Sequence, residues 1–128
     1  MDTRTKIVDL EAACDAARRA RGAGKSVKLV AGHFDPLLAA HARRLREVAA
    51  EGAALFVVIR EPERPILPAR ARAELVAALR VVDYVVLAEA LASEDSFGRL
   101  QPDAVYREEA ADQRRTLGLM LHVQSRHR

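Results

Sequence analysis

The chain has little cysteine, few aromatic residues and no long apolar run, and each shortage excludes a class of protein. Its single cysteine, Cys14, rules out an internal disulfide framework and fits a reducing compartment. No apolar stretch is as long as a membrane span and no signal peptide is visible at the N-terminus, so we expect a cytoplasmic protein that does not contact a membrane. Tryptophan is absent and the net charge is only +3, so the composition gives little support for a nucleic-acid partner.

The remaining composition favours one folded domain. Hydrophobic residues make up 50% of the 128 residues, which is enough for a real core and too much for a disordered chain. We expect a single domain over residues 1–128, with residues 1–26 forming a leader helix region that packs on it.

Apolar segments alternate with helical patterns along the chain. Helices are expected at residues 9–21, 38–51, 69–81, 93–100 and 109–115, with Asp9 and Ser93 as caps, and residues 61–68 form a loop rich in proline. Strands are expected at residues 27–31, 54–59, 84–87, 104–107 and 119–123, and the last of them holds Met120 and Leu121 in the core. Such strands predict a parallel sheet covered on both faces, with residues 27–31 in the centre and residues 84–87 toward an edge.

The most informative stretch, residues 28–41, reads KLVAGHFDPLLAAH. Gly32 ends the first strand, where ligands of parallel sheets bind, and can let a ligand approach closely. Pro36 disfavours helical angles at Asp35, so a helix should begin after Asp35 and hold His41 in its first turns. Because a helix N-terminus attracts phosphate, the stretch predicts a phosphate site. An ordinary strand, turn and helix with His41 on the surface is the alternative.

The same stretch resembles the G-x-F-D-x-L-H-x-G-H signature of the cytidylyltransferase-like nucleotidyltransferases. Five positions match in register: Gly32, Phe34, Asp35, Leu37 and His41. The first motif histidine is replaced by Leu38, and the motif glycine is replaced by Ala40. The resemblance implies that His41 is catalytic and that the nucleotide or its phosphates lie against Gly32, His33, Phe34, Asp35, Leu38 and Ala40.

The resemblance extends over most of the chain, and is greatest to the adenylyltransferase domain of bacterial ADP-heptose synthase. The matching features are the loop at residues 64–68 (RPILP), Arg72 in the helix that follows, the segment 82–86 (VDYVV) and Pro102-Asp103. They imply a Rossmann-like, doubly wound α/β sheet of five parallel strands in the order 3-2-1-4-5, in many members as a homodimer. Arg72 and Arg107 are then further candidates for binding the nucleotide or its phosphates.

The departures from the family pattern lie in the site. Besides the two motif changes, Glu108 and Glu109 stand where the family has glycines, Leu67 replaces an asparagine, and the chain ends before a Ser/Thr-rich phosphate-binding segment. We therefore expect a protein that binds a nucleotide or a phosphorylated small molecule, with catalysis weakened or lost. The alternative is an active Mg²⁺-dependent enzyme that moves AMP or CMP from ATP or CTP to a phosphorylated acceptor such as heptose phosphate.

Three readings of the neighbouring residues stay open. His33 could supply the donor that Leu38 lacks, or it could be half exposed and bonded to the backbone. His33, Asp35 and His41 could together bind a divalent metal, although the favoured reading assigns no metal ligands. Arg43, Arg44 and Arg46 are expected to form a solvated helix face.

Overall fold

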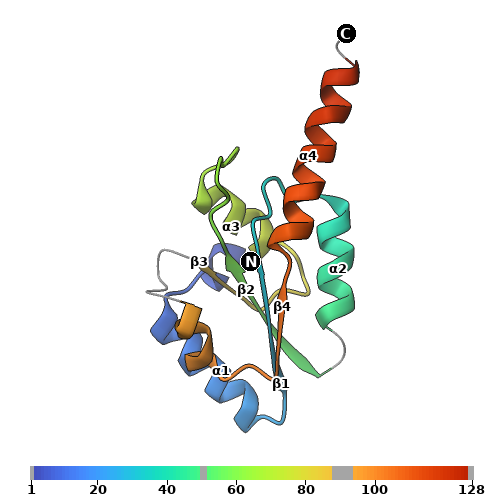
Figure 1. Ribbon diagram of the computed structural model, residues 1–128. Helices are drawn as coiled ribbons and strands as arrows, with labels where there is room; N and C mark the ends of the chain where they lie inside the picture. Colours follow the sequence, from blue (N-terminus) through green and yellow to red (C-terminus); the bar gives the residue numbers. More distant parts are fainter. Residues whose placement is uncertain (1, 50–51, 88–93, 127–128) are drawn as a thin grey trace.

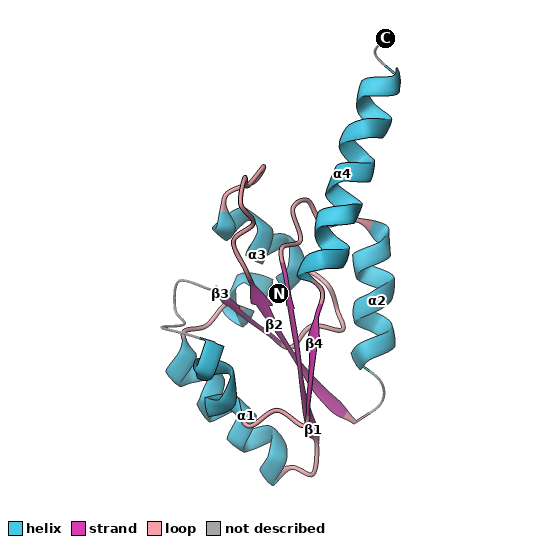
Figure 2. Ribbon diagram, viewed as in Figure 1, coloured by secondary structure: helices cyan, strands magenta, loops and turns pink. Residues whose placement is uncertain are grey.

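The computed structural model describes residues 2–49, 52–87 and 94–126, and at its centre is a parallel sheet (Figures 1 and 2). Within the described residues the sheet has four strands in the order β3-β2-β1-β4. Their bounds are β1 Ser26–Gly32, β2 Ala53–Ile59, β3 Tyr84–Leu87 and β4 Ala104–Arg107. Every pair of neighbouring strands is parallel, with β1 at an inner position and β3 at an edge, as the sequence predicts.

The helices cover both faces of this sheet. Alternate strand residues point to opposite faces, so Leu29 and Phe56 pack under α1 (Leu10–Gly22) and the 3-10 segment η3 (Glu94–Leu100). Val30 and Val57 point the other way, toward α2 (Ala39–Ala49) and α3 (Ala69–Ala77). The strands β1 and β2 are almost completely buried and are largely apolar for that reason.

Most predicted helix boundaries lie within a few residues of those observed. The Asp9 carboxylate caps α1 by accepting a hydrogen bond from the Ala12 amide at 2.8 Å. A short 3-10 turn, η1 (Thr3–Lys6), precedes it. The expected helix at residues 69–81 ends earlier, because the chain turns at Ala78 and Leu79 to bring Val82 under the sheet. The proposed cap Ser93 lies outside the described residues, and the segment that follows it, η3, is a 3-10 helix.

The predicted fifth strand is wrong. Residues 119–123 belong to α4 (Glu109–Arg126), which extends beyond the sheet (Figure 1). Met120 and Leu121, expected in the core, are 44% and 56% exposed. A short apolar run fits a strand or a helix equally well, but Leu117, Met120 and Leu121 follow the spacing of one helical face. Among the described helices, none has the length and apolar character that crossing a membrane requires.

Candidate functional site

The loop that follows β1 lies where ligands bind in open parallel sheets. β1 pairs with β2 on one side and with β4 on the other, so its carboxyl end is the point where the strand order reverses. The first turn of α4 follows β4 and therefore begins beside this loop. The predicted start of a helix after Asp35 is confirmed, since α2 begins at Ala39.

The loop directs two backbone amides at one point. Phe34 has a φ of 50°, in the left-handed region that non-glycine residues seldom adopt. In this conformation the amides of His33 and Phe34 both donate to Asp112 Oδ2, over 2.7 and 3.4 Å. Two adjacent N–H groups that converge on one oxygen form a small anion cradle.

Gly32 makes this convergence sterically feasible. A Cβ atom at Gly32 would lie 2.5 Å from Asp112 Oδ2 and 2.9 Å from the Phe34 ring. In this structure Gly32 permits the close approach of a carboxylate of the chain itself, and the approach of a ligand at Gly32 stays a prediction.

His41 lies at the centre of the site and not on the surface, so the alternative of a surface histidine is wrong. Its side chain is only 1% exposed and its ring lies 5.2 Å from that of Phe34. Nδ1 accepts a hydrogen bond from the Leu38 amide at 2.8 Å, so the hydrogen must be on Nε2. Nε2 then donates to Asp112 Oδ1 at 2.7 Å. The backbone amide of Leu38, at the position of the first motif histidine, thus fixes the tautomer of His41.

Asp112 connects these parts, and sequence reasoning missed it. Its carboxylate is fully buried and accepts hydrogen bonds from the His33 and Phe34 amides, from His41 and from Arg115 Nη1 at 2.8 Å. Burial alone raises the pKa of this carboxyl, but the bonds from His41, His33 and Arg115 outweigh burial and hold the pKa below its usual range. A signal was available, because an acid in the first turn of the helix after β4 must lie near the end of β1 if those two strands are neighbours.

Asp35 and Arg72 bind the loops around the site to one another. The Asp35 carboxylate accepts hydrogen bonds from the Ile66 and Leu67 amides at 2.6 and 2.8 Å, which holds the proline-rich loop in place. Arg72 is fully buried, and its guanidinium donates to His33 O, Arg60 O, Leu67 O and the Glu61 carboxylate. In this structure both side chains are engaged by the protein, and contact of either with a nucleotide stays a prediction.

A hollow of about 320 Å³ adjoins the loop. It is lined by His33 and Asp35, by residues 62–64 of the proline-rich loop, and by Gln113, Thr116, Leu117 and Met120 of α4. His33 is 6% exposed, so the expectation of a half-exposed side chain is wrong. Burial lowers the pKa of its imidazole against the opposing effect of the Asp112 and Glu109 carboxylates. The ring is therefore neutral at neutral pH and faces a space that a small ligand could enter.

The other candidate residues are less central. Leu38 and Ala40 are half-buried at the start of α2. Arg107 is exposed, and its guanidinium lies over the Phe97 ring at 5.2 Å. Arg43 and Arg46 are exposed, as expected of a solvated helix face, whereas Arg44 lies over the Tyr106 ring and forms an ion pair with Glu108 at 2.5 Å. Glu108 is thus already partnered, so less of its charge would act on a bound phosphate than the sequence implies.

The proposed His33, Asp35 and His41 metal group is not assembled. In the described part of the chain, no group of three or more His, Cys, Asp or Glu side chains is placed to hold a metal ion. The reason is visible in the contacts, since the Asp35 carboxylate is used by two amides and both ring nitrogens of His41 are hydrogen-bonded.

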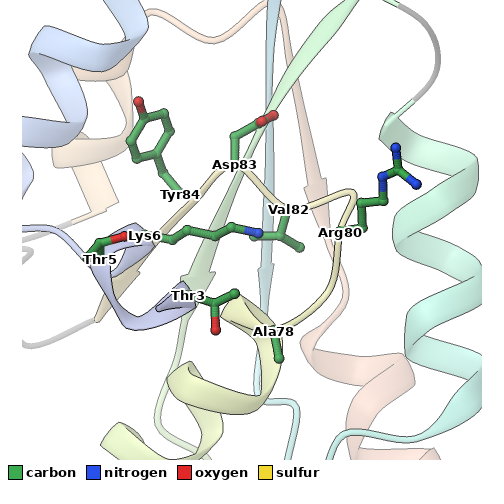
Figure 3. Close-up of a pocket in the computed structure, with 8 residues that line it drawn as sticks. All are labelled: Thr3, Thr5, Lys6, Ala78, Arg80, Val82, Asp83 and Tyr84. Atoms are coloured by element: carbon green, nitrogen blue, oxygen red, sulfur yellow. The ribbon is translucent and has the colours of Figure 1, made fainter. Parts of the chain in front are cut away.

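A second hollow, of about 640 Å³, lies at the amino end of β3 (Figure 3). Its lining includes Lys6, Arg80 and Asp83, but none of the motif residues. Lys6 Nζ donates to the Leu79 carbonyl at 3.1 Å, and Asp83 accepts from the Leu55 amide at 2.8 Å, so both groups serve the fold. The strands are parallel, so this hollow is at the opposite end of the sheet from the loop after β1.

Fold and site together define an α/β protein with an anion cradle at the carboxyl end of its central strands. A family model described as cytidylyltransferase-like matches residues 29–116, which run from β1 into α4. The chain belongs to this cytidylyltransferase-like nucleotidyltransferase family, as the motif resemblance predicts.

Two relatives support the assignment. The bifunctional protein HldE of Halorhodospira halophila (strain DSM 244 / SL1) is 34% identical over 89 residues, which are 62% of this chain and 19% of that protein. The chain therefore corresponds to about a fifth of the length of that relative. The crystal structure of the lipopolysaccharide core biosynthesis protein from Thermoplasma volcanium GSS1 is similar with a TM-score of 0.56 and 25% identity, over 62% of this chain and 71% of that chain.

Proposed function

We propose that the chain binds a nucleotide or another phosphorylated small molecule at the loop after β1, and that its nucleotidyl transfer is weakened or lost. One observation carries the proposal. The His33 and Phe34 amides and the His41 Nε2–H group converge on a single negatively charged group, so this point of the structure favours an anion. The adjacent hollow offers space for the rest of a small ligand.

The expected loss of catalysis follows from the donors that are missing or engaged. Enzymes that transfer phosphoryl-type groups stabilise the charge on the transferring phosphate with positioned donors. Leu38 has no side-chain donor, and the Nε2–H of His41 is already bonded to Asp112. Glu109 adds a further carboxylate near His33. The chain retains a place for an anion and lacks part of the machinery that acts on it.

The alternative function is Mg²⁺-dependent transfer of AMP or CMP from ATP or CTP to a phosphorylated acceptor. The similarity to HldE and to a lipopolysaccharide core biosynthesis protein favours a sugar phosphate such as heptose phosphate as that acceptor. Mg²⁺ would arrive with the triphosphate, since the described residues include no cluster that fits the ion. The specific observation in favour is His33, a neutral, buried imidazole beside the hollow that could replace the donor absent at Leu38.

We predict that the wild-type protein releases pyrophosphate from ATP or CTP with heptose phosphate at no more than the rate of His41→Ala. One lost donor typically lowers such a rate by about a hundredfold to a thousandfold, and here more than one is affected. The double substitution Leu38→His with Ala40→Gly should increase nucleotide affinity more than turnover, because Glu109 and Asp112 stay in place. A coupled pyrophosphate assay, run beside calorimetric titrations, measures both quantities.

Robust pyrophosphate release by the wild-type protein would contradict this proposal and support the alternative. In that case His33→Ala should reduce the rate about as severely as His41→Ala, because both imidazoles would then act on the transferring phosphate.

A further inference from the structure

We propose that the Asp112 carboxylate occupies the anion cradle as an internal ligand, so that a phosphorylated ligand binds only by displacing it. This inference rests on the proposed function, because it assumes that the cradle receives a phosphate. It adds that the described conformation is self-blocked, and that the first turn of α4 is the blocking element.

The hydrogen bonds of Asp112 show which role its carboxylate plays. An acid in the first turn of a helix normally stabilises the free amides of its own helix. The Asp112 carboxylate instead bonds to the His33 and Phe34 amides and to His41, which are more than 70 residues away in the chain. These groups also form the site where the fold favours a ligand anion. Each N–H group can donate a full hydrogen bond to only one acceptor, so Asp112 and a ligand compete for them.

The packing excludes a shared arrangement. The position of a Cβ built on Gly32 is only 2.5 Å from Asp112 Oδ2, so the carboxylate fills the space above the loop. A phosphate oxygen placed there would meet a buried negative charge at contact distance as well as an occupied volume. Ligand and Asp112 therefore exclude one another both sterically and electrostatically.

The attachment of α4 allows such a displacement. Near the site the helix is held by polar contacts: those of Asp112, the ion pair of Arg44 with Glu108 just before the helix, and the hydrogen bond from Thr116 Oγ1 to the Asp35 carbonyl at 2.9 Å. Farther along, Leu117, Leu121 and Val123 are 57%, 56% and 45% exposed and bury little apolar area. A helix held by few polar contacts can move away at modest cost when an anion takes over the donors.

The test compares Asp112→Asn with the control Glu47→Gln in calorimetric titrations with inorganic phosphate, ADP and ATP. An asparagine side chain has the same shape but only one acceptor oxygen, so its NH₂ group must face either the loop amides or His41 Nε2–H. Asp112→Asn should bind these anions roughly ten- to a hundredfold more tightly than the wild-type protein. Glu47→Gln removes the same charge from an acid of α2 whose side chain is 67% exposed and makes no contact with the cradle, and it should change affinity by less than about threefold.

The outcomes separate this inference from the proposed function. Equal affinities of wild type and Asp112→Asn would overturn the inference and leave the proposed function standing. A folded Asp112→Asn protein that binds none of the three anions would overturn both. If Asp112→Asn does not fold, hydrogen exchange of wild-type α4 at saturating ADP decides: faster exchange at residues 109–116 supports displacement, and unchanged or slower exchange contradicts it.

Discussion

Arg72→Ala is expected to destabilise the protein by about 3–5 kcal/mol, a large share of the 5–15 kcal/mol typical of a folded domain. The side chain is fully buried and donates to His33 O, Arg60 O and Leu67 O. Its removal leaves these carbonyls without this donor. The loss costs about 1–3 kcal/mol of stability for each carbonyl that water cannot reach. The pair with Glu61 contributes little, because the Glu61 side chain is 55% exposed. Urea unfolding followed by circular dichroism measures the change.

Arg70→Ala is the matched control, on the same helix and of the same side-chain type. Its side chain is 56% exposed and pairs with Glu74 at 3.5 Å, so we expect a change of less than about 1 kcal/mol. Arg72→Lys should stay strongly destabilised, because an ammonium group cannot reach three carbonyls that diverge from a planar guanidinium. A loss below about 1 kcal/mol for Arg72→Ala would show that these contacts do not hold the loops.

Asp35→Ala is expected to cost about 2–4 kcal/mol and to release the proline-rich loop from the site. The carboxylate is buried and is the acceptor for the Ile66 and Leu67 amides, so its loss leaves two donors without a partner. Asp35→Asn keeps one acceptor oxygen and should cost less. Unfolding curves give the free energy, and amide exchange at Ile66 and Leu67 reports the loop.

Glu63→Gln supplies the control for charge, since Glu63 is an exposed acid of the same loop. Its unfolding free energy should stay within about 0.5 kcal/mol of the wild type. Protection of the Ile66 and Leu67 amides that survives in Asp35→Ala would mean that another group holds the loop.

The sequence predicted those parts of the fold that depend on local pattern. The apolar run at residues 54–59 is rich in β-branched residues, which favours a strand buried on both faces, and β2 is one. The order of turns and helices then gave the parallel sheet, and the motif placed Gly32, His33 and His41 at one loop. Each of these conclusions needed only neighbouring residues and the rules of strand and helix geometry.

What the sequence does not predict has one local cause and one long-range cause. The local cause is that a five-residue apolar run such as residues 119–123 cannot distinguish strand from helix by itself. The long-range cause is interaction between segments far apart in the chain. Asp112 was missed because its importance lies in the β1–β4 pairing, which brings the first turn of α4 to the loop. Contact of Arg72 with a nucleotide stays a prediction, and its observed partners, three backbone carbonyls and Glu61, follow from no sequence pattern.

Asp112 already accepts the hydrogen bonds that the donors of the cradle would offer to a ligand. Deprotonated Asp112 satisfies His41, Arg115 and two amides, so the cradle is already paired without any ligand. Since this pairing lowers the pKa of the Asp112 carboxyl, its contribution to stability is present above the unfolded pKa and is lost as the pH falls through the folded one. Under the proposed displacement, a ligand must offer more to these donors than Asp112 does.

The central claim is that the loop after β1 binds anions, and an amide-resolved NMR titration of the wild-type protein with ATP, with and without Mg²⁺, tests it most directly. The His33 and Phe34 amides and the His41 ring are the donors of the cradle, so their resonances should shift together and saturate with one dissociation constant. The same titration of His41→Ala should require more ATP. Resonances of His33, Phe34 and His41 that stay unchanged at millimolar ATP, or shifts confined to the hollow around Lys6 and Arg80, would contradict the account.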